Sequence, residues 1–255
     1  MNALPTRKTH PARKTSRLLR IGWLVLRHYR AFRAFRTLTP EERKQHLAAP
    51  RQFTQSLLDL GPLFIKLGQI LSTRPDVLPE EYITELARLQ EHVPPFPFAQ
   101  VRMLIKEQFK KEIEDLFRSF EEDPIAAASL AQVHLAVLKD GTPVAVKMQR
   151  PFAKERITTD LDLLSGLIEI VRHLFPGKVR RLNLVAGFTE FQRYTLQELD
   201  FSLEARTLER FKRNFSAWPD IIIPHVYWDV VTPKVLTMER VSGLRLHDIT
   251  PTLSE

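Results

Sequence analysis

The chain has 255 residues, of which 44% are hydrophobic, and it contains no cysteine. This length and composition suit one large domain or a domain with an extension, and the missing thiols exclude disulfides, thiolate metal sites and a cysteine nucleophile. The net charge of +8 comes from residues 1–36, which hold ten of the 38 Lys/Arg and no acid, leaving 28 Lys/Arg against 30 Asp/Glu elsewhere. Because a nucleic-acid-binding domain carries its basic patch on the fold, we expect no nucleic-acid partner.

The basic N-terminal arm, residues 1–36, combines arginines with apolar and aromatic side chains in "RLLRIGWLVLRHYRAFRAF". Its longest apolar run, "IGWLVL", is far shorter than the roughly 18 residues of a membrane span and too short for a secretory signal core. The composition is typical of a helix that lies on an anionic bilayer, so we expect an anionic membrane surface as a partner. Two alternatives stay open: a disordered basic tail followed by a partly buried helix, and an organellar transit peptide.

The first part of the chain carries helical patterns. "TPEER" places Thr39 as an N-cap with Pro40 behind it, and "LPEEY" opens another helix with Pro79 and two acids in its first turn. We predict disorder over residues 1–16 and helices over 17–36, 40–59, 61–73 and 79–91. The rigid "VPPFPF" that follows predicts a boundary between a helical extension, residues 37–97, and a second domain, residues 98–255.

The second domain mixes helical and strand patterns. Residues 131–151 read as two β-branched, alternating strands around the turn Lys139-Asp140-Gly141. Apolar residues spaced by three and four predict helices elsewhere. The expected elements are helices over 98–111, 155–175 and 182–213 and a second hairpin over 224–241, which together give an α+β fold.

The strand that ends in Val144-Ala145-Val146-Lys147 is followed by a helix with acids and then by the second hairpin. This is the element order of the N-terminal lobe of a protein kinase, in which a strand lysine reaches the nucleotide phosphates and a helix glutamate holds it. Alone the signal is weak, because a lysine at a strand end is usually just solvated. Where a kinase has a Gly-rich loop, this chain has Ala126, Ala127, Ala128 and Ser129, which give up most of glycine's access to positive φ. Without context, a small-residue loop that opens a helical turn is the simpler interpretation of these four residues.

Lys66, Gly68 and Gln69, in "FIKLGQIL", interrupt the apolar face of a predicted helix. An unpaired buried amine or amide is expensive, and nothing nearby in the sequence supplies an obvious partner. These residues therefore require partners from elsewhere in the fold.

Taken together, "KLGQ", "STRPDVLPEEY", "LQEHVPPFP", "AAASLAQVH", "VAVKMQRP" and "ELDFSLEA" resemble, in order and spacing, the UbiB/AarF-type atypical kinase family over about residues 50–248. The resemblance implies a protein-kinase-like N-lobe, with a small antiparallel sheet and a long helix, behind a helical N-terminal extension. It implies ATP as the cofactor, with Mg²⁺ expected in a full-length enzyme, and a role in ubiquinone biosynthesis or lipid homeostasis. It also suggests quinone-biosynthesis proteins or a second copy as partners, at the cytoplasmic face of a bacterial inner membrane or, alternatively, in mitochondria.

The resemblance also implies roles for individual residues. Lys66, with Gly68 and Gln69, would form a regulatory clamp over the nucleotide site by pairing with two acids, Glu198 and Asp200. A third acid, Glu204, would hold Lys147. Without the resemblance, three acids on one helix are more simply a solvated face.

"LTMERVSG", residues 236–243, resembles the strand and hinge that join the two lobes of a kinase. Met238 would occupy the gatekeeper position, and the backbone of Glu239 and Val241 would meet the adenine edge. Taken alone, Met238 would simply be a core residue.

The printed sequence ends at Glu255, just past the predicted hinge, and contains no Asp-Phe-Gly. A kinase needs a catalytic-loop acid, an Asn and that Asp for its metal ions. We therefore expect the C-lobe to be absent from this chain, with no catalytic residue and no metal ligand within it. Two functions stay open: the N-terminal part of a UbiB-type kinase or ATPase, and a catalytically inactive truncated pseudokinase fragment that binds a membrane or a partner.

Overall fold

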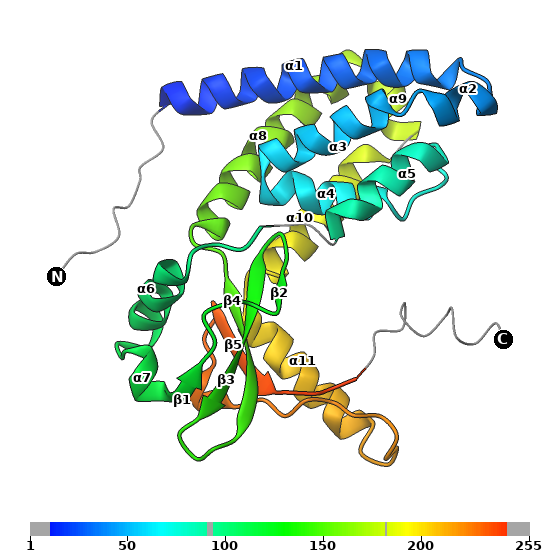
Figure 1. Ribbon diagram of the computed structural model, residues 1–255. Coiled ribbons are helices and arrows are strands. Elements are labelled where there is room, and N and C mark those ends of the chain that lie inside the picture. Colours follow the sequence, from blue (N-terminus) through cyan, green and yellow to red (C-terminus); the bar gives the residue numbers. More distant parts are fainter. Residues whose placement is uncertain (1–10, 91–93, 182, 244–255) are drawn as a thin grey trace. The chain divides into compact units, whose positions relative to one another are not determined.

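The computed structural model describes residues 11–90, 94–181 and 183–243 (Figure 1). The chain forms two compact units, Met1–Val93 with Phe152–Thr195, and Pro94–Pro151 with Leu196–Glu255. The single division expected after residue 97 lies close to the first junction, but residues 152–195 return to the first unit.

The first unit is helical. Its elements are α1 (Pro11–Arg36), α2 (Pro40–Gln45), α3 (Ala48–Leu60), α4 (Pro62–Leu71), α5 (Glu80–Ala87), the 3₁₀ turn η1 (Arg88–Gln90), α8 (Ala153–Leu174), α9 (Pro176–Arg181) and α10 (Leu184–Gln197), whose last residues belong to the second unit. Thr39 caps α2 in a reciprocal capping box with Glu42, which satisfies two backbone donors at the helix start. Gly61, at φ 100°, separates α3 from α4, a conformation that favours glycine.

Helix α1 is part of this unit and not a free arm. Ile21, Leu24 and Phe35 are buried, and the Phe35 ring meets Tyr82 of α5 edge-on at 5.3 Å. The prediction of disorder is wrong for residues 11–16, because α1 begins at Pro11; residues 1–10 lie outside the described part of the chain. Burial of the inner face of α1 is the physical reason, since packing supplies most of a helix's stability.

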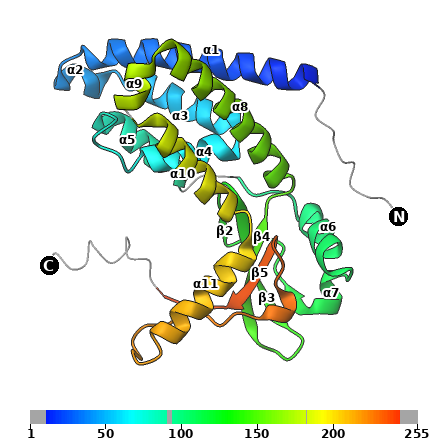
Figure 2. The ribbon, with the colours of Figure 1, turned by 180° about the vertical axis from the view of Figure 1, so that it is seen from behind.

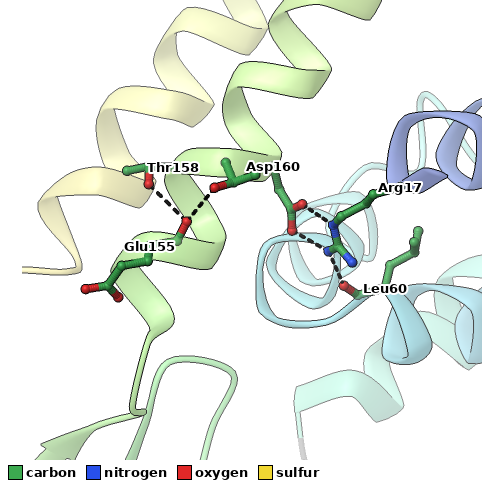
Figure 3. A network of polar contacts seen from close by, with 6 residues as sticks. Arg17, Leu60, Glu155, Thr158 and Asp160 are labelled. Atoms are coloured by element: carbon green, nitrogen blue, oxygen red, sulfur yellow. Dashed lines mark hydrogen bonds and ion pairs between the residues drawn. The ribbon is translucent and has the colours of Figure 1, made fainter. Parts of the chain in front are cut away.

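A buried ion pair joins α1 to α8 (Figure 3). The Arg17 guanidinium makes two hydrogen bonds to the Asp160 carboxylate, one of them Nη2 to Oδ2 at 2.6 Å. Arg17 Nη2 also donates to the Leu60 carbonyl oxygen at 2.8 Å, at the end of α3. Asp160 is 2% exposed, and its hydrogen bonds raise the pKa of Arg17. One arginine therefore connects three helices.

The second unit is built on an antiparallel sheet. Its strands are β1 (Phe117–Phe120), β2 (Ala126–Ala127), β3 (Ala131–Leu138), β4 (Pro143–Gln149) and β5 (Val235–Glu239), in the order β1-β3-β4-β5 with β2 also paired to β3. Its helices are α6 (Phe98–Phe109), α7 (Ile113–Leu116), α11 (Phe201–Asn214) and the 3₁₀ turn η2 (Trp228–Val230). On one sheet face Val144, Val146 and Met148 form a core with α6 residues such as Val101 and Ile105.

The opposite face of the sheet packs against α11, as Figure 2 shows from behind. Phe201 and Ala205 of α11 form a small buried cluster there with Ala131 and Leu236. The predicted α+β class, with a small antiparallel sheet and a helix beside it behind a helical extension, is confirmed.

Three predicted elements are wrong in detail. The helix expected over 40–59 is divided into α2 and α3, because the backbone leaves the helical conformation at His46 (φ −105°, ψ 50°). The helix expected over 182–213 is broken between α10 and α11, because Asp200 adopts an extended backbone (φ −124°, ψ 96°) and caps α11 through its bond from the Ser202 amide. The hairpin expected over 224–241 contains one strand, β5; its other arm is reduced to two isolated bridges, Val226 to Met238 and Thr232 to Val235, and the turn η2. The short elements β1, β2, α7 and α9 were not predicted.

Candidate functional site

Lys147 lies near the end of β4, on the sheet face that α11 covers. In the antiparallel register Lys147 stands between Val133 of β3 and Leu236 of β5. Ala145 stands in the same way opposite Met238. Directly opposite residues share a face, and successive residues alternate. Lys147, Ala145 and Met238 therefore share one side of the sheet.

Glu204, in the first turn of α11, meets Lys147. The Lys147 ammonium nitrogen lies 2.8 Å from each carboxylate oxygen of Glu204. The two side chains remain 27% and 40% exposed, so the pair is accessible to solvent. The structure brings together the two residues that the resemblance paired, and the ammonium is oriented by a carboxylate while still within reach of an external anion.

The segment Ala126-Ala127-Ala128-Ser129, called the alanine segment below, begins with a short strand and not with a helical turn. Ala126 and Ala127 pair with Val133 and Gln132 as strand β2. The Ala128 amide donates to the Ala131 carbonyl oxygen at 2.7 Å, and the Ala128 carbonyl oxygen accepts from Arg150 Nε at 2.9 Å. Ser129 is buried. The segment is thus fixed by hydrogen bonds from both directions, unlike a flexible glycine loop.

Arg150 is a residue that the sequence analysis overlooked. Besides Ala128 it binds the Pro94 carbonyl oxygen through Nη2 at 2.6 Å and stacks over the Phe96 ring at 5.7 Å. Desolvation lowers the pKa of Arg150. It joins the alanine segment to the start of the second unit, and its place directly after β4 was the only signal for it in the sequence.

The predicted hinge begins at the end of β5. Met238 is half-buried and packs beside the Phe201 cluster. The Glu239 amide donates to the His225 carbonyl oxygen at 2.8 Å, and the Glu239 carboxylate accepts from the His225 amide. Of the Glu239 backbone, the carbonyl oxygen is therefore the group that could meet an adenine edge. Val241 is exposed, and residues 244–248, the end of the resemblance, lie outside the described residues.

Gly68 and Gln69 find their partners inside the helical unit. A Cβ atom at Gly68 would lie 2.5 Å from Leu89 Cδ1 and 2.8 Å from Leu57 Cδ1, so only glycine allows α4 to pack this closely. Gln69 Nε2 donates to the Leu89 carbonyl oxygen at 3.1 Å. These two residues therefore have a local packing role, which explains why they occur within an apolar helix.

The pairing of Lys66 stays a prediction. Lys66 is half-buried in the first unit, whereas Glu198 and Asp200 belong to the second. Asp200 has a role of its own, since its carboxylate accepts from the Ser202 amide at 2.9 Å and caps α11. A carboxylate at a helix N-terminus is favoured by the helix dipole as well as by this bond.

Comparison with known proteins decides the family. Residues 88–254 match the ABC1 atypical kinase-like domain. The chain belongs to this family. A probable protein kinase UbiB of Pseudomonas fluorescens is 44% identical over 208 residues, 81% of this chain and 39% of that protein. An uncharacterised protein of Synechocystis is 38% identical over 217 residues, 84% of this chain and 38% of that protein.

The chain is also similar to a solved structure. A Mycobacterium tuberculosis protein, determined in complex with erythromycin, is 31% identical and aligns with a TM-score of 0.54 over 72% of this chain and 46% of that one. The recognition of a UbiB-type atypical kinase from the sequence is confirmed. The chain spans about two fifths of the length of the curated relatives that it matches.

Kinase-like families use ATP and Mg²⁺ in general. Among the described residues, no group of three or more His, Asp or Glu side chains is placed to hold a metal ion. The same part of the chain contains no helix that is both long enough and apolar enough to span a bilayer.

Proposed function

We propose that this chain is the nucleotide-binding N-terminal part of a UbiB-type atypical kinase or ATPase. The observation that carries the proposal is the contact of Lys147 with both carboxylate oxygens of Glu204 at 2.8 Å, within one unit and on the sheet face that presents Ala145 and Met238. A strand lysine held by a helix glutamate is how kinase-like proteins bind the α- and β-phosphates.

The residues present fit ATP. Lys147 supplies a charge for the phosphates and Glu204 keeps its amine oriented, while Ala145 and Met238 offer an apolar surface for the base. The alanine segment puts small side chains near the same face, since β2 pairs with Val133 and Gln132 of β3. When bound, ATP supplies a phosphoryl group for transfer or hydrolysis; the resemblance to UbiB/AarF proteins supports a use in ubiquinone biosynthesis or lipid homeostasis.

The resemblance also supports a regulatory role for Lys66. In this proposal Lys66 pairs with Glu198 and controls access to the nucleotide site, while Gly68 and Gln69 fix α4 within its unit. Replacing Lys66 with alanine in the full-length protein would then change nucleotide preference or turnover. An unchanged activity profile would leave only the packing role of this helix.

The test of nucleotide binding compares Lys147→Ala with Lys212→Ala in the full-length protein. Lys212 is an exposed lysine on α11 of the same unit and serves as the matched control. Because a hydrogen bond to a charged group contributes about 1.5–3 kcal/mol, we expect Lys147→Ala to weaken Mg²⁺-ATP binding about tenfold or more in calorimetry. Equal affinities for wild type and Lys147→Ala would refute the proposal.

A second function, membrane docking, is favoured by the outer face of α1. Leu19, Trp23 and Leu26 are 68%, 58% and 49% exposed and are spaced so that they share the side opposite Ile21 and Leu24. Arg30 and Arg33 continue this face, and α1 contains no acidic residue. Apolar side chains among arginines fit an anionic bilayer. In this alternative the chain acts as a membrane- or partner-binding module without catalysis.

Flotation with phosphatidylcholine vesicles, with and without phosphatidylglycerol, tests the docking function. We expect binding only to the anionic vesicles, weakened by salt because the charges are exposed, and lost when Trp23 and Leu26 are both replaced by serine. Replacing Trp218, an exposed tryptophan of the second unit, by serine should leave flotation unchanged. If the double Trp23 and Leu26 variant still floats, α1 is not the docking surface.

A further inference from the structure

Two hydrogen bonds hold the start of α11, one from the end of β4 and one to the segment just before β5. Gln149 Nε2, at the end of β4, donates to the Leu199 carbonyl oxygen at 2.9 Å. The Phe201 amide, in the first residue of α11, donates to the Pro233 carbonyl oxygen at 3.0 Å. Gln149 is 2% exposed, so solvent cannot take the place of the Leu199 carbonyl as the acceptor for its amide group. These bonds fix where α11 begins relative to β4 and β5.

The Phe201 side chain contacts the functional lysine directly. The Lys147 ammonium nitrogen lies 4.9 Å from the centroid of the Phe201 ring, within the range in which the ring face attracts a cation. The ring is 2% exposed and is held by Ala205 and Leu236. Lys147 is thus positioned by a carboxylate and an aromatic ring that come from the same turn of one helix.

Strand geometry connects these contacts. Gln149 and Lys147 are two residues apart on β4, so both point to the face that α11 covers. Phe201 and Glu204 are three residues apart on α11 and therefore lie on neighbouring positions of one helix face. A shift of the helix start would move Phe201 and Glu204 together and take both away from Lys147.

We propose that Gln149 and Phe201 are positioning residues for Lys147. Gln149 acts by fixing the start of α11, and Phe201 acts through its ring and its amide bond to Pro233. In this arrangement the nucleotide-binding lysine keeps its orientation before any ligand arrives. The benefit to nucleotide affinity rests on the proposed nucleotide function, whereas the positioning of Lys147 can be measured without it.

The affinity test uses two variants of similar side-chain size. Gln149→Met removes the side-chain amide donor, and Phe201→Leu removes the aromatic ring. A net hydrogen bond, lost in Gln149→Met, and a cation–π contact, lost in Phe201→Leu, each contribute about 1 kcal/mol, so we expect Mg²⁺-ATP binding to weaken about fivefold in each variant. The same substitutions made in a Lys147→Ala background should cause no further loss, because the residue through which they act is gone. An equal loss in both backgrounds would show a general structural effect and overturn the proposal.

Gln132→Met is the matched control. Gln132 is also a buried strand glutamine, with bonds to the amide and the carbonyl oxygen of Phe96, but it lies opposite Met148 and so on the other face of the sheet. We expect this variant to lower thermal stability and to leave nucleotide affinity unchanged.

NMR of the protein labelled in its lysine side chains separates the two proposals. A ring face shifts the signals of nearby methylene groups, so we expect the Lys147 signals to move in Phe201→Leu, and to move also in Gln149→Met, without nucleotide. If wild type binds no nucleotide but these signals move, the nucleotide function fails and the positioning stands. If the Lys147 signals stay unchanged in both variants, the positioning is refuted whatever the nucleotide affinity.

Discussion

Both units contain ion pairs between residues that are distant in sequence, and the pairs Arg17–Asp160 and Lys147–Glu204 differ in how far they are exposed to solvent. Arg17–Asp160 in the helical unit joins α1 to α8, with the carboxylate 2% exposed. Lys147–Glu204 in the sheet unit joins β4 to α11 and stays 27% and 40% exposed. A buried charge must keep its partner, because losing the partner leaves an uncompensated charge. A half-exposed pair contributes little to stability and leaves its ammonium available to a ligand.

The largest expected effect is on the helical unit. Asp160→Ala leaves the Arg17 guanidinium without its carboxylate partner, and we expect the free energy of unfolding of that unit to fall by about 3 kcal/mol. Trp23 is the tryptophan of this unit, since the chain's other two are Trp218 and Trp228. Urea unfolding followed by Trp23 fluorescence, with the others replaced by phenylalanine, measures this loss.

Asp162→Ala provides the control for Asp160, because Asp162 is exposed on the same helix. We expect its effect to stay within about 0.5 kcal/mol. If the two aspartate variants unfold at the same urea concentration, the buried ion pair does not stabilise this unit.

Two glycines in the helical unit should respond to replacement by alanine with opposite changes in the free energy of unfolding. Gly68→Ala adds a methyl group into contact with Leu89 and Leu57, and overpacking costs about 1–3 kcal/mol, more than the gain in helix propensity. Gly166→Ala meets no atom within 4 Å, so we expect a gain of about 0.5–1 kcal/mol. The same unfolding measurement decides, and a stabilising Gly68→Ala would refute the close packing of α4.

The sheet unit should lose stability in acid through His134. This residue is fully buried, with Nδ1 donating to the Glu121 carbonyl oxygen and Nε2 accepting from Gln132 Nε2. Burial lowers its pKa below the ordinary value of 6.5. The unfolded state therefore binds more protons than the folded state below about pH 6.5. We expect the stability of this unit to be constant above that pH and to decrease below it.

The predicted slope for His134 is up to about 1.4 kcal/mol per pH unit. Urea unfolding of a Trp23→Phe variant, which reports only on Trp218 and Trp228, measures it between pH 7.5 and 5. His134→Asn removes the titrating ring, so its stability should depend less on pH over this range. An equal pH dependence in both proteins would assign the acid sensitivity to other groups.

The smallest expected stability change belongs to the half-exposed pair. Glu204→Gln should alter the free energy of unfolding of the sheet unit by no more than about 0.5–1 kcal/mol, while nucleotide affinity falls because Lys147 loses its orienting charge. Glu122→Gln, on an exposed loop of the same unit, should change neither quantity. A loss of stability as large as that of Asp160→Ala would remove the contrast between the two pairs.

Local patterns in the sequence were sufficient to predict many of the helices and strands. The alternation in "VHLAVL" and "PVAVKMQ" with Asp140-Gly141 between them predicted β3, β4 and their turn, and the helix expected over 155–175 matches α8. The break at Asp200 was missed because a helical spacing of apolar residues continues through it, and only the Gln149 bond and the cap on α11 reveal the interruption. The short strands β1 and β2 were missed because four and two residues are too few to show an alternating pattern, and both form by pairing with β3.

In the candidate site, too, some features could be predicted from the sequence and others could not. The residues alone were enough to recognise the family and the α+β class, and the resemblance to UbiB/AarF proteins then pointed to Lys147 and Glu204. The folded structure was needed to show that Gln149 binds the chain just before α11 while the Phe201 ring meets Lys147. It was also needed to show that α1 packs into the helical unit and that Gly68 and Gln69 serve packing. The physical reason is that such contacts join residues tens to more than a hundred positions apart, and their energy exists only once the chain has brought them together.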